Sequence, residues 1–326
     1  MSVTRMTMAK AITAGLRRVL AEDPKTLLMG EDIGKLGGVY RITEGLQAEF
    51  GEDRVMDSPL AESGIIGTSI GLALRGYRPI AEIQFDGFVF PAFNQITTQL
   101  AKLHMRSEGR LTVPVTIRIP FGGGIGSVEH HSESPEALFA HTAGLRLMTP
   151  STPHDAYWMI QEAVASPDPV IFFEPKRRYW LKGDVDTEHR AAPAATAQVV
   201  RQGNDATVVA WGPLVPVALA AAQAAQEDGR DVEVIDLRSL SPIDFDTVTA
   251  STKKTGRLVI AHEAPTFGGL GGEIAARVTE RAFYELQAPV LRVGGFHMPY
   301  PPSKVEANYL PDIDRLLEAL DRSFAH

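Results

Sequence analysis

Residues 54–85 read RVMDSPLAESGIIGTSIGLALRGYRPIAEIQF, and this stretch decides the fold. Its two ends, 54–57 and 77–85, are short apolar runs of the kind that form strands. Between them, 59–75 has the length and apolar spacing of a helix. A helix that connects two strands in this way places them parallel in one sheet. The stretch therefore predicts a parallel sheet covered by helices.

The same alternation continues on both sides of this unit. Further strands are expected at 26–30, 113–120 and 169–174, and helices at 6–20, 89–103 and 154–165. From 183 to 203 the periodicity fades into small and polar residues, which indicates a linker. Beyond it, strands and helices alternate again up to a final helix at 312–324. The sequence predicts an α/β protein with two doubly wound domains, residues 1–182 and 204–326.

Composition excludes several classes of function. The 326 residues include 32 Lys and Arg, 40 Asp and Glu and no Cys, for a net charge of −8. Without Cys there is no disulfide, no Cys-ligated metal or iron–sulfur site and no thiol nucleophile. The acidic balance disfavours a nucleic-acid binder, which needs clustered positive charge.

No apolar run approaches the roughly 20 residues that span a bilayer. The N-terminal stretch has four basic residues before its first acidic one, Glu22, as organellar targeting peptides do. Its apolar residues, however, recur at helical spacing, which favours the first amphipathic helix of the fold. A cytoplasmic location is therefore expected.

Glu62 is the first candidate for chemistry. It follows the predicted strand 54–57, and ligands of open parallel sheets bind beyond the carboxyl ends of strands. In the simplest structural interpretation Ser58 caps a helix, Pro59 occupies its first position and Glu62 complements the helix dipole. Alternatively, Glu62 lies among glycines where water is excluded, which would make it a proton partner rather than a solvated charge.

The segment 121–136 is the second candidate. Its run 122–126, Gly-Gly-Gly-Ile-Gly, could cradle a phosphate, but it lacks the Gly-Lys-Ser/Thr ending of a P-loop. His130 and His131 follow and could serve as metal ligands, although no third ligand stands at a suitable spacing. General acid–base catalysis by one of these imidazoles is a better interpretation.

The basic cluster Lys176, Arg177 and Arg178 follows a strand and is interpreted as a solvated face, a subunit contact or an anion-binding edge.

Several motifs in order resemble the β subunit of the E1 component of 2-oxo acid dehydrogenase complexes. They are Gly30-Glu31-Asp32, the segments 57–62, 81–85, 90–96 and 131–136, Pro150-Ser151-Thr152-Pro153, and 234–240. This family uses thiamine diphosphate, and the resemblance covers nearly the whole chain. It implies a pyrimidine-binding domain followed by a transketolase C-terminal-like domain.

The resemblance also implies roles for individual residues. Glu62 matches the carboxylate that hydrogen-bonds the cofactor's aminopyrimidine and so promotes loss of the thiazolium C2 proton. Leu60, Gln84 and Phe88 match positions that line the pyrimidine pocket. His131 matches the histidine that transfers protons while the acyl group passes to lipoamide. Phe88 stands where related subunits have tyrosine, so it keeps the ring but lacks the hydroxyl.

Metals and partners follow from the same resemblance. The family's potassium site, built of backbone carbonyls, corresponds to Ala163, Val164, Ser166 and Asp168, with Ser166 in place of an aspartate found in some relatives. The sequence lacks a Gly-Asp-Gly segment followed by the asparagines that hold Mg²⁺ and diphosphate. The resemblance therefore implies that an E1 α subunit supplies both groups within an α2β2 heterotetramer, and that this chain alone is inactive. It also implies that the E2 lipoyl acyltransferase takes the acyl group.

The substrate is the remaining choice. The segments 131–137 and 174–177 are closer to branched-chain subunits than to pyruvate subunits, so oxidative decarboxylation of branched-chain 2-oxo acids such as 3-methyl-2-oxobutanoate is favoured. Pyruvate is the alternative. A non-catalytic scaffold that binds the acyltransferase core, or a split sugar transferase, is also consistent with the sequence, although phosphosugar recognition needs basic residues that the loop 122–126 lacks.

Overall fold

The computed structural model describes residues 3–326, which form two compact units. Unit 1 comprises the residues up to Phe121 together with 138–193, and unit 2 comprises 122–137 together with 194–326. We call residues 122–137 the His131 segment. The domain bounds expected from the sequence, 1–182 and 204–326, do not set this segment apart, whereas its contacts place it in unit 2.

Unit 1 is built on a parallel sheet with strand order β6-β7-β5-β4-β2-β3. The strands are β2 (Thr26–Gly30), β3 (Val55–Asp57), β4 (Arg78–Glu82), β5 (Thr116–Phe121), β6 (Arg146–Met148) and β7 (Val170–Pro175). Because the strands β2 to β4 are parallel neighbours, the segments after them share one edge of the sheet. A separate antiparallel ribbon pairs β1 (Val3–Thr7) with β8 (Lys182–Asp186).

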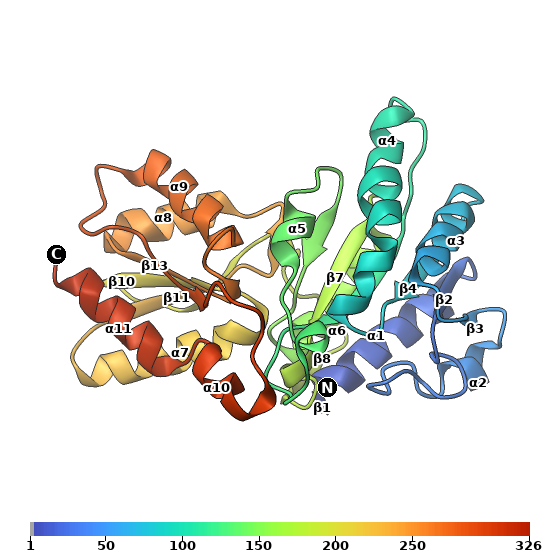
Figure 1. The fold of residues 1–326 in the computed structure, drawn as a ribbon, viewed down its shortest axis with the longest axis horizontal. Helices are drawn as coiled ribbons and strands as arrows, with labels where there is room; N and C mark the ends of the chain where they lie inside the picture. The colour runs from blue at the N-terminus through green and yellow to red at the C-terminus, as the bar shows by residue number, and fades with distance from the viewer. Residues whose placement is uncertain (1–2) are drawn as a thin grey trace. The chain divides into compact units, whose positions relative to one another are not determined.

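Helices cover this sheet. They are α1 (Met8–Glu22), α2 (Leu46–Phe50), α3 (Glu62–Leu74), α4 (Leu103–Arg106) and α6 (Pro153–Ala165), while the short α5 (Glu136–Ala140) begins within the His131 segment and ends in unit 1. Helices α1 and α6 lie side by side (Figure 1). They approach so closely that a Cβ added at Gly15 would meet the Tyr157 carbonyl oxygen at 2.9 Å. Thr7 and Thr152 cap the two helices by accepting backbone N–H bonds.

The prediction of a single helix at 89–103 is wrong. The chain instead forms a 3₁₀ helix η1 (Asp86–Ala92), a π turn η2 (Gln95–Gln99), a second 3₁₀ turn η3 (Leu100–Lys102) and then α4. Pro91 lies inside η1 and cannot donate the bond that a regular helix needs. Thr97 and Thr98 donate their hydroxyls to carbonyls four residues back, which perturbs the following turn.

Unit 2 is a second sheet with strand order β14-β13-β10-β11-β9, in which only the edge strand β9 is antiparallel to its neighbour. The strands are β9 (Gln198–Arg201), β10 (Ala206–Ala210), β11 (Val232–Asp236), β13 (Leu258–Pro265) and β14 (Leu291–Gly295), with the short β12 (Ser239–Ser241) outside this sheet. The residues expected to form a linker, 183–203, contain most of β8 and all of β9.

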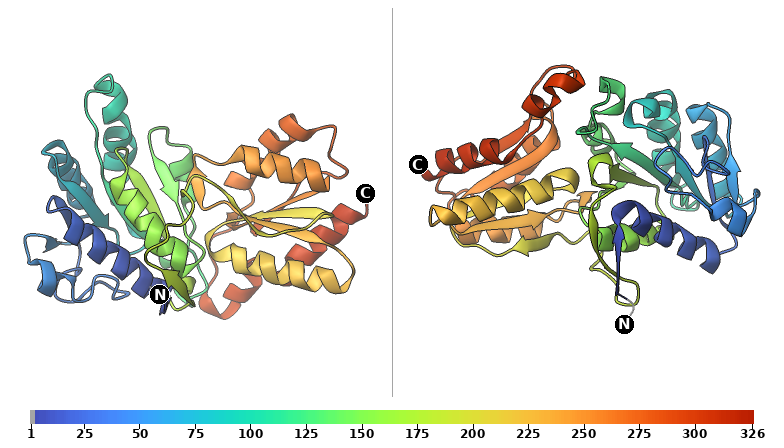
Figure 2. Two further views of the ribbon diagram at one scale, coloured as in Figure 1. Left: turned by 180° about the vertical axis from the view of Figure 1, so that it is seen from behind. Right: turned by 90° about the horizontal axis from the view of Figure 1, so that it is seen from below.

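The helices of unit 2 cover both faces of its sheet, α7 and α11 on one and α8 and α9 on the other (Figures 1 and 2). They are α7 (Val215–Glu227), α8 (Phe245–Thr255), α9 (Leu270–Ala282), α10 (Glu306–Tyr309) and α11 (Ile313–Phe324). The alanines of α7 pack with valines of β10 and β11 in the core. The predicted α/β class with two doubly wound units is confirmed. Within residues 3–326, every helix is too short or too polar to cross a membrane.

A buried arginine joins three strands of unit 1. Arg118 on β5 is 1% exposed and donates to both oxygens of Glu174 on β7, Nε at 2.6 Å and Nη2 at 3.0 Å. Its Nη1 donates to Glu82 at the end of β4. Tyr179 donates its hydroxyl to Glu174 at 2.6 Å. Burial raises the pKa of Glu82, and the positive charge of Arg118 opposes that shift.

We predict that Arg118→Met lowers the free energy of unfolding by about 3–5 kcal/mol, because two carboxylates stay buried without their cation. Denaturant unfolding of the full chain measures the change. The matched control is Arg17→Met, which breaks a half-exposed pair with Glu49 and should cost less than about 1 kcal/mol. Equal losses in the two variants would contradict the prediction.

Candidate active site

Three loops of unit 1 meet at the carboxyl edge of its sheet. Glu31 follows β2, Leu60 follows β3 and Gln84 follows β4, and these strands are parallel neighbours. Gln84 donates its side-chain amide to the backbone carbonyl of Glu31 at 3.4 Å. Asp57 accepts the backbone N–H of Gly34 at 2.6 Å, which fixes the loop after β2. The structure therefore brings together the loops of the predicted cofactor-binding residues.

Glu62 is the first residue of α3 and is half-buried. The helix begins later than expected: its N-cap is Ala61, which makes no side-chain cap bond, so the expected capping by Ser58 with Pro59 in the first turn is wrong. The Ser58 hydroxyl is instead buried without a hydrogen-bond partner in the structure. The first turn of α3 leaves backbone N–H groups unsatisfied, and their partial positive charge favours a carboxylate there.

Glu31 is a site residue that the sequence analysis used only as part of a motif. Burial raises the pKa of its carboxyl, and the negative charges of Asp32 and Glu62 raise it further. The carboxyl groups of Glu31 and Glu62 therefore lie within electrostatic reach of each other. A carboxyl whose pKa is shifted by burial and by neighbouring charges is typical of sites that hold or move a proton. The position of Glu31 directly after a buried strand was the signal available in the sequence.

Two apolar side chains accompany these polar groups. Phe88 lies on η1, is half-buried, and packs edge-on against Phe85 with 5.7 Å between ring centroids. Leu60 is 70% exposed, so its side chain is open to a ligand or to another molecule. Together they offer an apolar wall and a flat ring beside the carboxylate Glu62 and the amide Gln84.

A second buried ion pair supports this edge. Asp86, between Gln84 and Phe88 in the sequence, is 1% exposed and accepts a bond from Lys176, which is 2% exposed. The Lys176 ammonium also lies 5.5 Å from the centroid of the Phe85 ring. The interpretation of the basic cluster 176–178 as a solvated face or a contact edge is therefore wrong for Lys176, which fixes the loop after β4 from inside.

His131 belongs to unit 2. It ends the 3₁₀ turn η4 (Glu129–His131), is half-buried, and its ring lies 4.3 Å from the ring of His130. Among residues 3–326 no group of three or more His, Asp or Glu side chains is arranged to hold a metal ion. The His131 segment thus presents an imidazole, the side chain whose charge changes most readily near neutral pH.

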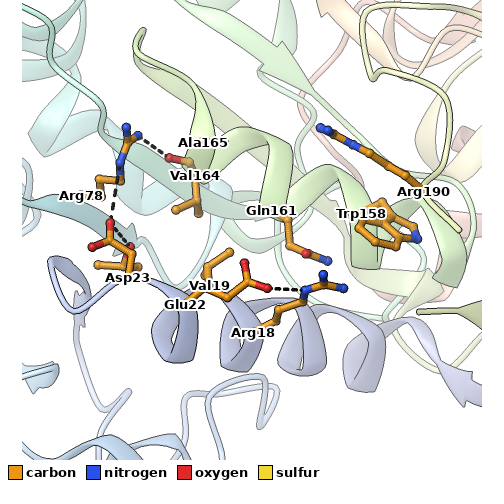
Figure 3. Close-up of a pocket in the computed structure, with 11 residues that line it drawn as sticks. Arg18, Val19, Glu22, Asp23, Arg78, Trp158, Gln161, Val164, Ala165 and Arg190 are labelled. Carbon is orange, nitrogen blue, oxygen red and sulfur yellow. Dashed lines mark hydrogen bonds and ion pairs between the residues drawn. The ribbon is translucent and has the colours of Figure 1, made fainter. Parts of the chain in front are cut away.

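The residues named for potassium do not fit a cation site. Arg78 donates Nη1 to the carbonyl of Val164 at 2.9 Å and to that of Ser166 at 3.4 Å (Figure 3). Ser166 donates its backbone N–H to Ala163 at 3.2 Å and its hydroxyl to the carbonyl of Asp168 at 2.9 Å. All four candidate oxygens accept bonds from the chain itself.

A pocket of about 380 Å³ lies beside this arginine and is lined mainly by residues of α1 and α6. Figure 3 shows these lining residues. Its arginines already face carboxylates: Arg18 lies 2.8 Å from Glu22, and Arg78 lies 3.8 Å from Asp23. Because these charges are compensated, the pocket has no built anion site, and the carboxyl edge of the sheet remains the candidate active site.

Comparison with known proteins agrees with this geometry. The chain matches the family "Transketolase, pyrimidine binding domain" over residues 4–180 and "Transketolase, C-terminal domain" over 195–316. A solved structure described as a split-gene transketolase, inactive β4 tetramer, has the same fold, with a TM-score of 0.81, 23% identity and 98% of each chain covered. Fold and site therefore define a transketolase-type pair of domains, as predicted.

Similar curated proteins show to which family of transketolase-type proteins the chain belongs. The chain is 64% identical to a pyruvate dehydrogenase E1 component subunit beta of Leifsonia xyli subsp. xyli, over 99% of this chain and 96% of that protein. It is 52% identical to a 3-methyl-2-oxobutanoate dehydrogenase subunit beta of Mycobacterium tuberculosis, over 97% and 91%. The chain belongs to the β subunits of 2-oxo acid dehydrogenase E1 components, a thiamine-diphosphate-dependent family.

A buried carboxyl of the His131 segment makes the stability pH-dependent. Burial, with a smaller contribution from the charge of Glu263, raises the pKa of Glu136 from 4.5 to about 8, although Trp211 opposes the shift by donating its indole N–H at 3.3 Å. Between these pH values the folded chain keeps a proton that the unfolded chain releases. The stability from this group is therefore complete below about pH 4.5 and is lost as the pH rises toward 8.

We predict that Glu136→Gln removes this dependence, because glutamine stays neutral and can still accept from Trp211. The free energy of unfolding of the parent chain should fall relative to the variant by as much as about 1.4 kcal/mol per pH unit. Denaturant titrations at about pH 6, 7 and 8 measure the difference. A difference that is constant over this range would show that Glu136 is already ionised in the folded state.

Proposed function

We propose that this chain is the β subunit of an E1 enzyme that oxidatively decarboxylates branched-chain 2-oxo acids and passes the acyl group to lipoamide on an E2 acyltransferase. The observation that carries the proposal is Glu62 at the first turn of α3, within electrostatic reach of Glu31 and on the sheet edge that also bears Gln84. A carboxylate positioned at the first turn of a helix, with a second carboxyl within electrostatic reach, suits proton exchange on a bound heterocycle.

The residues present fit the aminopyrimidine of thiamine diphosphate. Glu62 offers an acceptor for a ring nitrogen that carries a proton, Gln84 offers an amide, and Phe88 offers a flat face. The cofactor, when bound, supplies a nucleophilic carbon that adds to the 2-oxo group and accepts the electron pair left when carbon dioxide departs. Glu62 holds the pyrimidine proton, Leu60 and Phe88 offer apolar contacts to the bound ring, and His131 moves a proton during acyl transfer.

The partners complete the proposal. We assign the diphosphate and Mg²⁺ to an E1 α subunit in an α2β2 heterotetramer, and no potassium ion is included because Arg78 and Ser166 already donate to the four candidate carbonyls. We assign the complex to the cytoplasm.

The substrate assignment is supported by the segments 131–137 and 174–177, which are closer to branched-chain subunits. The names of the two relatives indicate different substrates. The relative at 64% identity is a pyruvate dehydrogenase subunit, and the one at 52% is a 3-methyl-2-oxobutanoate dehydrogenase subunit. Pyruvate is therefore the second candidate.

We predict that Glu62→Ala lowers decarboxylation by about 10²–10⁴-fold, because a positioned acid or base contributes this much to catalysis. The assay is reduction of an artificial electron acceptor by the native complex with thiamine diphosphate and Mg²⁺. Size-exclusion chromatography should show unchanged assembly. Glu52→Ala, which removes an exposed carboxylate of the same unit, is the control and should leave turnover unchanged. Unchanged turnover in Glu62→Ala would favour a non-catalytic scaffold.

We predict that the same complex prefers 3-methyl-2-oxobutanoate to pyruvate in kcat/KM by at least about tenfold, the size of effect that a few added methyl contacts in a pocket give. Initial rates with each substrate measure the ratio. A preference for pyruvate would keep the mechanism and change the substrate. Absence of turnover with either would remove the enzyme assignment.

A further inference from the structure

The glycine run of the His131 segment has an unusual backbone. Gly122, Gly124 and Gly126 all have positive φ, at 82°, 82° and 71°. Backbone N–H groups presented by such turns form a concave nest that binds anions. The composition of this run could have served a phosphate, although it lacks the ending of a P-loop, and the structure shows what the amides bind.

The anions are carboxylates of the chain's own C-terminal part. Glu306 accepts the backbone N–H of Gly124 on Oε1 at 2.8 Å and that of Gly126 on Oε2 at 3.0 Å. Glu263 accepts the N–H of Gly123. Both carboxylates are nearly buried, at 7% and 3% exposure. Hydrogen bonds from backbone N–H groups to a buried carboxylate are among the stronger ones in proteins.

Tyr300 completes the contact. Its hydroxyl donates to Glu306 at 2.7 Å and accepts the N–H of Gly124 at 3.3 Å. A Cβ at Gly123 would overlap this hydroxyl, and a Cβ at Gly122 would lie 2.8 Å from the Glu263 carboxylate. The glycines are therefore required by close packing against the chain's own side chains, which leaves no room for an external phosphate in the nest.

The nest is connected to His131 through the backbone. Gly122 donates its N–H to the carbonyl of Glu133 at 2.9 Å, which ties the start of the segment to a residue just after His131. His131 itself closes the turn η4 by donating its N–H to Val128 at 3.0 Å. A displacement of the glycine run would therefore reach His131 through only a few hydrogen-bonded residues.

We infer that Glu306, supported by Tyr300 and Glu263, is a positioning residue that holds the His131 segment for acyl transfer to lipoamide. The inference rests on the proposed function for the role of His131, whereas the anchoring itself rests on the contacts above. Because decarboxylation depends on Glu62 and Gln84 of unit 1, loss of the anchor should impair acyl transfer more than decarboxylation. A misplacement of about 1 Å can cost up to about 10²-fold in rate.

The test uses Glu306→Gln in the full chain within its native complex. Glutamine keeps the size of the side chain, but its NH₂ group replaces one of the two acceptors and faces a backbone donor. The matched control is Glu233→Gln, another buried carboxylate of unit 2, which pairs with Lys254 and has no contact to the glycine run. Tyr300→Phe, which removes one hydroxyl from the same contact, is the second variant.

Two measurements distinguish the anchoring of the His131 segment by Glu306 from the proposed role of His131 in acyl transfer. Hydrogen–deuterium exchange over residues 122–131 should accelerate at least about tenfold in Glu306→Gln, less in Tyr300→Phe and not in Glu233→Gln, since exchange follows local opening. Reductive acylation of lipoamide should fall by about tenfold or more in Glu306→Gln, while artificial-acceptor decarboxylation changes by less than about twofold.

Unchanged exchange in both Glu306→Gln and Tyr300→Phe would overturn the anchor. Accelerated exchange with an equal fall in both reactions would overturn the positioning role. If the parent complex turns over no 2-oxo acid, the proposed function fails, and the exchange data still decide whether Glu306 anchors the segment.

Discussion

Arg118 brings a positive charge into the centre of unit 1, where water cannot solvate it, and the strands around it are arranged to compensate that charge. In the sheet register Arg118 lies opposite Glu82 on β4, and Glu174 on β7 meets the same guanidinium. Separating such buried charges costs several kcal/mol, so the ion pairs hold β4, β5 and β7 in register at the level of Arg118, although β5 and β7 continue three residues beyond the end of β4. The loops that leave those ends are held by this constraint, and the candidate active site is built on the same sheet edge.

A second buried ion pair stabilises the same sheet edge. Lys176 and Asp86 pair without access to solvent and fix the loop between Gln84 and Phe88. Glu62 needs no such pair, because the free N–H groups at the start of α3 favour its negative charge. Buried charges therefore fix the loops, while the half-buried carboxylates remain able to exchange protons with a ligand.

Unit 2 uses carboxylates as internal anions. Glu306 and Glu263 fill a nest of glycine amides that in other proteins binds phosphate. The protonated form of Glu136, favoured by burial among Trp211 and Glu263, belongs to the same segment. The segment that carries His131 is thus held to unit 2 by polar contacts, although in the sequence it lies within the span of unit 1.

The sequence by itself determined most helices and strands of both units, because apolar periodicity is a local property that packing then selects. It also placed Glu62 and Gln84 on one sheet edge, since parallel strands end together. Only the tertiary structure decided that Lys176 is buried, that Arg78 meets the carbonyls of Val164 and Ser166, that the charge of Glu62 contributes to the raised pKa of Glu31, and that Glu306 holds the glycine run. The physical reason is distance along the chain: Lys176 lies 90 residues from Asp86, and Glu306 lies 180 and 182 residues from the glycines it binds, so no local pattern records these contacts.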